Sequence, residues 1–238
     1  MSTLAVTARS RSDRLFHVGM ALAMLLAVFI GFAPTFYLRS AHTGVPLTPL
    51  VQLHGILFSG WMLLLLAQTV LVANGQTAVH RRLGVIGAIL APALFVVGAM
   101  TAIAAVGRGQ QFKGIDPLPF LAIPLATILV FAGTVGAALW FRRRSDIHKR
   151  LMLIATIGAL TPAIARMDIA LGPLHGPPLA LFLTDAFILP CLINDRLRLG
   201  RIHPAYLWGA GILLFSQIGR LLVMRTDAWL VFAAWLIG

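Results

Sequence analysis

The residues of this sequence that could do chemistry are polar and charged side chains set inside long apolar stretches. An ionisable group within a membrane costs about 3 kcal/mol on insertion scales, so each one points to a function or to a buried partner. When these residues are placed by depth along the helices expected below, seven of them fall toward the same outer end. They are Gln52, His54, Arg166, Asp168, Asp185, Gln217 and Arg220.

These seven residues form a candidate site for a small ligand or for a proton relay. Asp168 and Asp185 would accept protons or cations, and Arg166 and Arg220 would hold these carboxylates or an anionic ligand. His54 would be the titrating or ligating group. Asp185 lies about 12 Å into its helix, too deep for its carboxylate to reach the interface. A second interpretation stays open, because the same groups could be salt bridges that only lock helices together.

Histidines form a second group of candidates, for a metal ion or for haem b. His17, His80, His148 and His203 each open an apolar stretch at the opposite, arginine-rich edge, whereas His54 lies inside one. Imidazole is a common ligand of metal ions and of haem iron, and a membrane haem needs two histidines that face each other at one depth. The candidates are therefore His54, His80, His148 and His203. The alternative is that histidines at such an edge only contact lipid headgroups.

The elements that must position these residues are membrane-spanning helices. The chain of 238 residues is 59% hydrophobic and only 11% charged, where a soluble domain is usually about a quarter charged. A spanning helix needs about 20 apolar residues. The sequence predicts an all-α transmembrane bundle, one domain over residues 1–238, with spans at about 17–38, 50–73, 83–106, 117–141, 149–168, 177–195 and 203–223.

A last apolar piece, at about 228–238, is too short to cross a bilayer in the same way. It could lie at the membrane interface or pair across the membrane, and in the second case the number of crossings would be eight.

Basic residues predict the orientation of these spans. Thirteen of the 19 lysines and arginines fall on one side, which the positive-inside rule places in the cytoplasm together with the N-terminus. We expect a bacterial inner-membrane location and contacts with anionic lipids at the cytoplasmic face, and no nucleic-acid partner. The thirteen are Arg9, Arg11, Arg14, Arg81, Arg82, Arg142, Arg143, Arg144, Lys149, Arg150, Arg196, Arg198 and Arg201.

Several chemistries are not indicated by the sequence. All seven acidic residues are aspartates, so a di-iron site built from several carboxylates and histidines is disfavoured. No lysine lies inside an expected span, which argues against a retinal-type Schiff base. The single cysteine, Cys191, excludes an internal disulfide framework. No motif identifies the chain as an enzyme of a particular class.

Three short motifs carry a resemblance to known proteins. Gln-Leu-His-Gly stands at 52–55, His-Arg-Arg-Leu-Gly at 80–84, and His-Lys-Arg-Leu at 148–151. Over about residues 17–223 the chain resembles a group of bacterial multi-helix membrane proteins with this loop motif, whose activity is not established. That group is distantly similar in layout to membrane b-type cytochromes. The resemblance implies a helix bundle and makes haem a candidate cofactor.

The sequence leaves three interpretations of function. The first is a polar intramembrane site toward the outer face, which binds a small ligand or relays protons. The second is a membrane redox protein that binds haem or a metal through its histidines. The third is an accessory subunit without catalytic activity, whose polar groups only pack helices together.

Overall fold

The computed structural model describes residues 3–42, 46–112, 114–167 and 176–238, and these form helices joined by short connections. Seven of the helical segments are long and apolar enough to cross a membrane, which confirms the predicted all-α bundle with about seven spans. The segments are Arg11–Tyr37, Pro49–Ala73, Thr77–Gly107, Pro117–Trp140, Ser145–Ile164, Pro178–Leu199 and Pro204–Val223.

Some of these spans consist of more than one helical piece. The elements are α1 (Thr3–Phe32), the π-helix η1 (Ala33–Tyr37), α2 (Arg39–His42), α3 (Pro49–Ala73), α4 (Thr77–Gly107), α5 (Pro117–Phe120), α6 (Ala122–Trp140), α7 (Ser145–Gly158), α8 (Thr161–Ile164), α9 (Gly176–Ala186), α10 (Ile188–Leu199), α11 (Pro204–Val223) and α12 (Asp227–Ile237).

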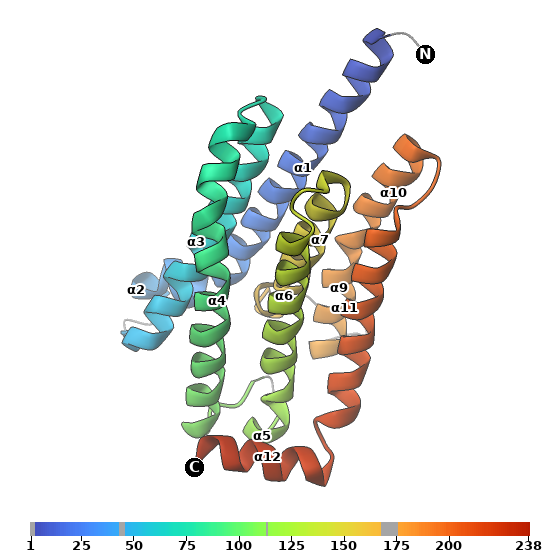
Figure 1. The fold of residues 1–238 in the computed structure, drawn as a ribbon. Coiled ribbons are helices and arrows are strands. Elements are labelled where there is room, and N and C mark those ends of the chain that lie inside the picture. Colours follow the sequence, from blue (N-terminus) through green and yellow to red (C-terminus); the bar gives the residue numbers. More distant parts are fainter. Residues whose placement is uncertain (1–2, 43–45, 113, 168–175) are drawn as a thin grey trace.

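The bundle has two distinct ends (Figure 1). At the upper end in that view lie the start of α1 and the loops that join α3 to α4, α6 to α7 and α10 to α11, which carry most of the basic residues; we call it the basic end. At the lower end α12 lies across the bundle, and we call it the α12 end. α3 and α4 form an antiparallel hairpin, while α7 packs among α1, α6, α9 and α11.

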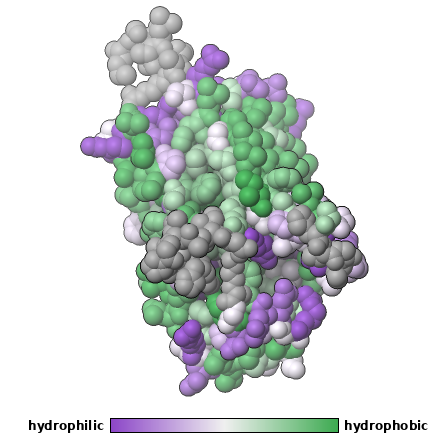
Figure 2. All heavy atoms as spheres, turned by 180° about the vertical axis from the view of Figure 1, so that it is seen from behind, coloured by the Kyte–Doolittle hydropathy of each residue, from purple (hydrophilic) through white to green (hydrophobic). Residues whose placement is uncertain are grey.

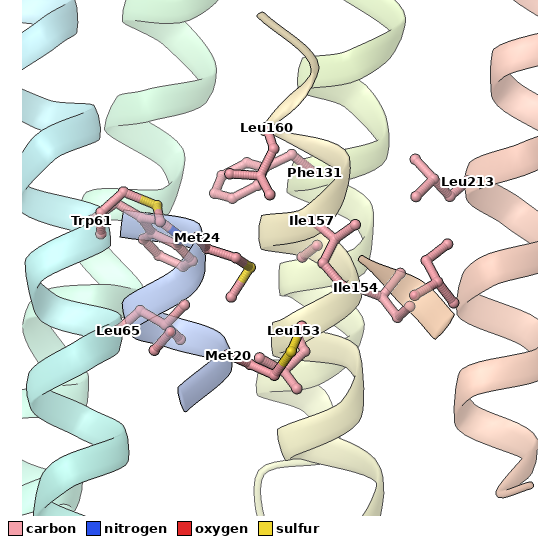
Figure 3. Close-up of a cluster of buried hydrophobic side chains, with 14 of the residues drawn as sticks. Met20, Met24, Trp61, Leu65, Phe131, Leu153, Ile154, Ile157, Leu160 and Leu213 are labelled. Atoms are coloured by element: carbon pink, nitrogen blue, oxygen red, sulfur yellow. The ribbon is translucent and has the colours of Figure 1, made fainter. Parts of the chain in front are cut away.

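The core forms where α1, α3, α6, α7 and α11 meet (Figure 3). α7 is the central element, and two thirds of its span is buried inside the protein. Its neighbours on most sides are therefore other helices rather than lipid. The labelled core residues are Met20, Met24, Trp61, Leu65, Phe131, Leu153, Ile154, Ile157, Leu160 and Leu213.

The outer surface of the bundle is apolar, as expected for helices that face lipid. Large side chains such as Ile89, Trp208, Phe215 and Leu222 are exposed on α4 and α11. Figure 2 shows apolar atoms over the upper part of one face, with hydrophilic atoms at its upper rim and again over its lower part. This distribution agrees with a protein that crosses a bilayer several times.

Small residues bring some helices close together. A Cβ atom at Gly31 of α1 would overlap the carbonyl oxygen of Ala163 in α8, so no larger residue fits there. A Cβ at Gly158 of α7 would lie 2.9 Å from Leu213 of α11. Such close approaches are the usual means by which helices associate within a bilayer.

The fifth and sixth spans are each broken near a proline. Pro162 cannot donate to the carbonyl of Gly158, and the Thr161 hydroxyl donates to that oxygen instead, at 3.3 Å. The fifth span therefore divides into α7 and α8 and ends at Ile164, earlier than the predicted 168. The sixth span divides at Phe187, three residues before Pro190.

The C-terminal segment does not make an eighth crossing. α12 has 11 residues, which gives a length of about 16 Å. It lies across the α12 end (Figure 1), and the Trp229 indole donates to the carbonyl of Leu118 at 3.0 Å. Ala233 is buried against Val106 and Leu121. The described residues therefore form seven spans and a short helix that closes one end.

Candidate functional site

The first polar group lies on α6, α9 and α11, in the half of the bundle nearer α12. Asp185 stands in the last turn of α9, just before the break at Phe187, and accepts a hydrogen bond of 2.8 Å from the Gln217 side chain of α11. Gln217 is 5% exposed. The two residues, which the sequence placed in one candidate site, are therefore direct partners between two helices.

Arg220 stands one turn beyond Gln217 on α11 and is 4% exposed. Its guanidinium donates to the Thr127 hydroxyl and, at 3.2 Å, to the carbonyl of Ile123, both on α6. Asp185 is close enough for its charge to attract that of Arg220. The Nε atom of Arg220 is buried without a hydrogen-bond partner. We call Thr127, Asp185, Gln217 and Arg220 the Asp185 cluster.

The second polar group surrounds Arg166, just after α8. Its guanidinium donates to the carbonyl of Pro162 at 2.7 Å. The same group lies over the ring of Phe32 at 4.6 Å and over that of Phe112 at 5.5 Å from the ring centres. Both distances are within the range of cation–π attraction. Arg166 thus contacts aromatic faces from two other parts of the chain.

His54 is close enough to Arg166 for the two charges to repel when the ring is protonated. Its ring lies 4.9 Å from that of Phe58, centre to centre, and its Nδ1 atom is buried without a hydrogen-bond partner. We call Phe32, His54, Phe112 and Arg166 the His54 cluster.

Gly98 of α4 leaves space beside the ring of His54. A Cβ atom there would lie 2.9 Å from the side chain of Ile128 of α6 and 3.8 Å from the ring of His54. Both clusters lie in the α12 half of the bundle, and we call them together the polar region.

Two of the predicted site residues stand apart from this region or cannot be placed. Gln52 is exposed at the start of α3, where its side chain donates to the carbonyl of Leu47 at 3.0 Å. It therefore stabilises its own helix end. Asp168 lies outside the residues that the structure describes.

Sequence reasoning missed the neutral partners of the two arginines. Thr127 lies within the apolar run of α6, and its hydroxyl also donates to the carbonyl of Ile123, as threonines in helices commonly do. Nothing in its local sequence signals a partner on α11. Phe32 and Phe112 are likewise indistinguishable from core or lipid-facing aromatics until the fold brings them to Arg166.

A different polar network, also missed, lies at the basic end. Arg150 of α7 forms a two-pronged ion pair with Asp195 of α10, with Nε to Oδ2 at 2.9 Å. The side chains are 5% and 2% exposed. Asp195 also accepts from the backbone N–H of His203 at 3.0 Å, and the His203 ring lies 3.2 Å from Asp146.

Asp13 of α1 extends this network to a third part of the bundle. It forms an ion pair with Lys149 of α7 and another, at 3.5 Å, with Arg198 of α10. Asn194 lies 3.5 Å from the same carboxylate. Lys149, Arg150 and Arg198 are therefore engaged by aspartates within the protein.

The haem and metal candidates separate into three places. His54 belongs to the polar region of the α12 half, and His203 belongs to the basic-end network. Only His80 and His148 are brought together, with ring centres 6.4 Å apart. Within the described ranges, no three residues among histidine, cysteine, aspartate and glutamate are grouped to hold a metal ion.

Comparisons with known proteins identify no relative. The chain has no match among protein-family models, curated proteins or solved structures. What it does is therefore inferred from its own side chains.

Proposed function

We propose that this multi-pass membrane protein binds a small anionic ligand in the polar region formed by the Asp185 and His54 clusters. The observation that carries the proposal is an excess of positive charge. In the part of the chain that the structure describes, this region contains two guanidinium groups, Arg166 and Arg220, and one carboxylate, Asp185.

The contacts of each arginine support this excess of positive charge. Arg166 contacts a backbone carbonyl and two aromatic rings, all of them neutral. Arg220 donates to a hydroxyl and a carbonyl, and Asp185 is already hydrogen-bonded by Gln217. Buried charges are costly unless they are paired, so a negative ligand would complete what these side chains leave unbalanced.

The chemistry of the two clusters suggests how such a ligand would be held. A guanidinium presents several N–H donors in one plane and suits carboxylate and phosphate oxygens. The Nε atom of Arg220 and the Nδ1 atom of His54 have no hydrogen-bond partner and could each contact the ligand. The rings of Phe32 and Phe112 offer an apolar wall. Asp185 is the group that would exchange a proton as the charge in the region changes.

We further propose the orientation and location that the basic residues favour. Exposed arginines gather at the basic end, which the positive-inside rule would place in the cytoplasm of a bacterium. The polar region would then open toward the outer face of the inner membrane. Anionic lipids would contact those arginines that are exposed at the basic end: Arg11, Arg81, Arg82, Arg142, Arg143, Arg144, Arg196 and Arg201.

Thermal unfolding of the purified protein in detergent would test the proposal. The unfolding temperature is measured in acetate, succinate, benzoate and phosphate at matched ionic strength. A ligand at 100 times its Kd stabilises a protein by about 2.7 kcal/mol, which raises this temperature by a few degrees. We expect at least one anion to stabilise the wild type and to lose this effect in Arg220→Gln and Arg166→Gln.

The matched control is Arg225→Gln, which removes an exposed arginine at the same end of the bundle. This variant should keep the full response. If no anion stabilises the wild type, or if all three variants respond like the wild type, the proposal is wrong. In that case, destabilisation by Arg220→Gln alone would favour a role for these polar groups in helix packing.

A further inference from the structure

The rings of His80 of α4 and His148 of α7 lie in a T-shaped, edge-on arrangement near the basic end, well away from the polar region discussed above. Their ring centres are 6.4 Å apart and the ring planes are at 77° to each other. Each histidine lies in the first turn of its helix, 68 residues apart in sequence. Two imidazoles from different spans are thus held at the same depth.

The tautomer of His148 suits a metal ligand. Its Nδ1 atom lies 2.8 Å from the backbone carbonyl oxygen of Ala138 on α6, and only an N–H group can donate to that oxygen. The neutral ring then carries its lone pair on Nε2. A hydrogen bond from the second ring nitrogen to a carbonyl is how metal-bound histidines are usually oriented.

Unsatisfied polar atoms lie on the other side of the pair. The Nδ1 atom of His80 and the side-chain oxygen of Gln68 on α3 are both buried without a hydrogen-bond partner. His80 is in reach of the Gln68 backbone, and the Gln68 amide lies over Gly84, one turn after His80. Buried polar atoms are nearly always satisfied, so these two atoms need a partner, which water or a bound group can supply.

The separation of the rings fits two ligands of one metal. A metal–nitrogen bond of about 2 Å, with about 1 Å more from the nitrogen to the ring centre, places the centres of two imidazoles about 5–6 Å apart, the larger value for ligands on opposite sides of the metal. The observed separation of 6.4 Å lies slightly above that range and is nearest to the value for ligands on opposite sides of the metal. Imidazole nitrogen favours copper, zinc, iron and nickel.

The surrounding charges do not oppose a metal. Each histidine is followed by two basic residues, but those after His148 are neutralised, since Lys149 pairs with Asp13 and Arg150 with Asp195. The two residues after His80 are Arg81 and Arg82, and both side chains are exposed. The charge of Arg81 repels the His80 ring when that ring is protonated. Because both arginines are exposed, their charge is screened by water.

We propose that His80 and His148 are the two histidine ligands of one transition-metal centre that joins α4 to α7. The metal would arrive either as a free ion, with Gln68 or water completing its coordination, or as the iron of a haem with the histidines on opposite faces. Both sources share the same chemistry, which is binding by two imidazole nitrogens.

The experiment uses the full chain, purified in detergent. The absorption spectrum detects a haem through its Soret band. Protein treated with EDTA is then titrated with Cu²⁺ to detect a site for a free ion. We expect either one haem or one tightly bound Cu²⁺ per chain, with affinity or occupancy reduced at least tenfold in His80→Ala and in His148→Ala.

His54→Ala is the matched control, because it removes a half-buried histidine in the other half of the bundle and should leave metal binding unchanged. Electron paramagnetic resonance of the wild type supplies a measurement that needs no variant to fold. It should show two imidazole nitrogens on Cu²⁺ or a low-spin haem with two imidazole ligands. The proposal is overturned if the wild type binds neither, if the spectrum shows fewer than two imidazoles, or if His54→Ala removes the metal.

Discussion

At the scale of single residues, charge is treated differently at the two ends of the molecule. At the basic end Arg150 meets Asp195 in a fully enclosed pair, with every prong of the guanidinium directed at oxygen. In the α12 half Arg220 is as deeply buried, yet its hydrogen bonds go to neutral oxygens. The Arg150 guanidinium has a carboxylate as its hydrogen-bonded counter-charge, whereas the Nε donor of Arg220 has no hydrogen-bond partner. This contrast is the reason to place a ligand in the α12 half.

The enclosed pair gives a first prediction. Asp195→Asn should lower the free energy of unfolding by about 3–5 kcal/mol, because it leaves the Arg150 charge buried without its counter-charge. The measurement is thermal or denaturant unfolding of the protein in detergent. Replacing both partners by apolar residues, Arg150→Met with Asp195→Leu, should recover most of the loss. An Asp195→Asn variant as stable as the wild type would contradict this account of the pair.

Asp185 gives a second prediction. Asp185→Asn should change the free energy of unfolding by only about 1 kcal/mol, because the amide oxygen can still accept from Gln217. It should abolish any proton uptake or release that accompanies anion binding, since the amide does not titrate. A pH-indicator dye in weakly buffered solution measures this as the stabilising anion is added. Unchanged proton exchange in the variant would show that another group titrates.

The sequence predicts those site residues that carry a charge or an amide within an apolar run, and it misses the others. Asp185, Gln217 and Arg220 stand out because a charged or amide side chain in an apolar run needs an explanation. Thr127 does not stand out, because a threonine satisfies itself within its helix. Asp195 lies beside arginines at the end of the apolar run, where a carboxylate is unremarkable until the fold buries it.

At the scale of elements, helix ends follow backbone chemistry more closely than apolar runs. The third and fifth spans, predicted to begin at 83 and 149, begin at Thr77 and Ser145, because arginine and histidine continue a helix beyond its apolar part. The fifth ends early at a proline. Its break and that of the sixth span are neighbours, since α8 packs on α9. Broken spans are where membrane proteins commonly place binding sites, and the Asp185 and His54 clusters adjoin these two.

The contact of α1 with α8 gives a third prediction. Gly31→Ala should destabilise the protein by about 1–3 kcal/mol, because the new methyl group would overlap the Ala163 carbonyl and push α1 away. Gly19→Ala, in the same helix but with open space around it, should be neutral or stabilising by up to about 1 kcal/mol. Unfolding temperatures of the two variants in detergent provide the comparison. Equal values would mean that the close approach of α1 and α8 contributes nothing to stability.

At the scale of the whole molecule, seven crossings place the two ends of the chain on opposite sides of the membrane. α12 does not alter this count, since it lies across the end of the bundle and packs on α4 and α5. Hydropathy alone could not decide whether α12 crosses the membrane, because α12 is as apolar as a span. Only its short length and the turn before it distinguish α12 from a spanning helix. The hydrogen bond from the Trp229 indole to the Leu118 carbonyl fixes the direction of α12.

The position of the C-terminus gives the last prediction. With the basic end in the cytoplasm, alkaline phosphatase fused after Gly238 of the full chain should be active, and green fluorescent protein fused there should not fluoresce. Reporters fused after Asn74, in the loop between α3 and α4, should give the opposite pattern, because this loop lies at the basic end. An eighth crossing would make both fusion points report the same side. A reversed pattern at both points would keep the seven crossings and overturn the orientation. The activity of a reporter shows which side of the membrane it is on, whereas a difference between the two points shows that an odd number of crossings lies between them.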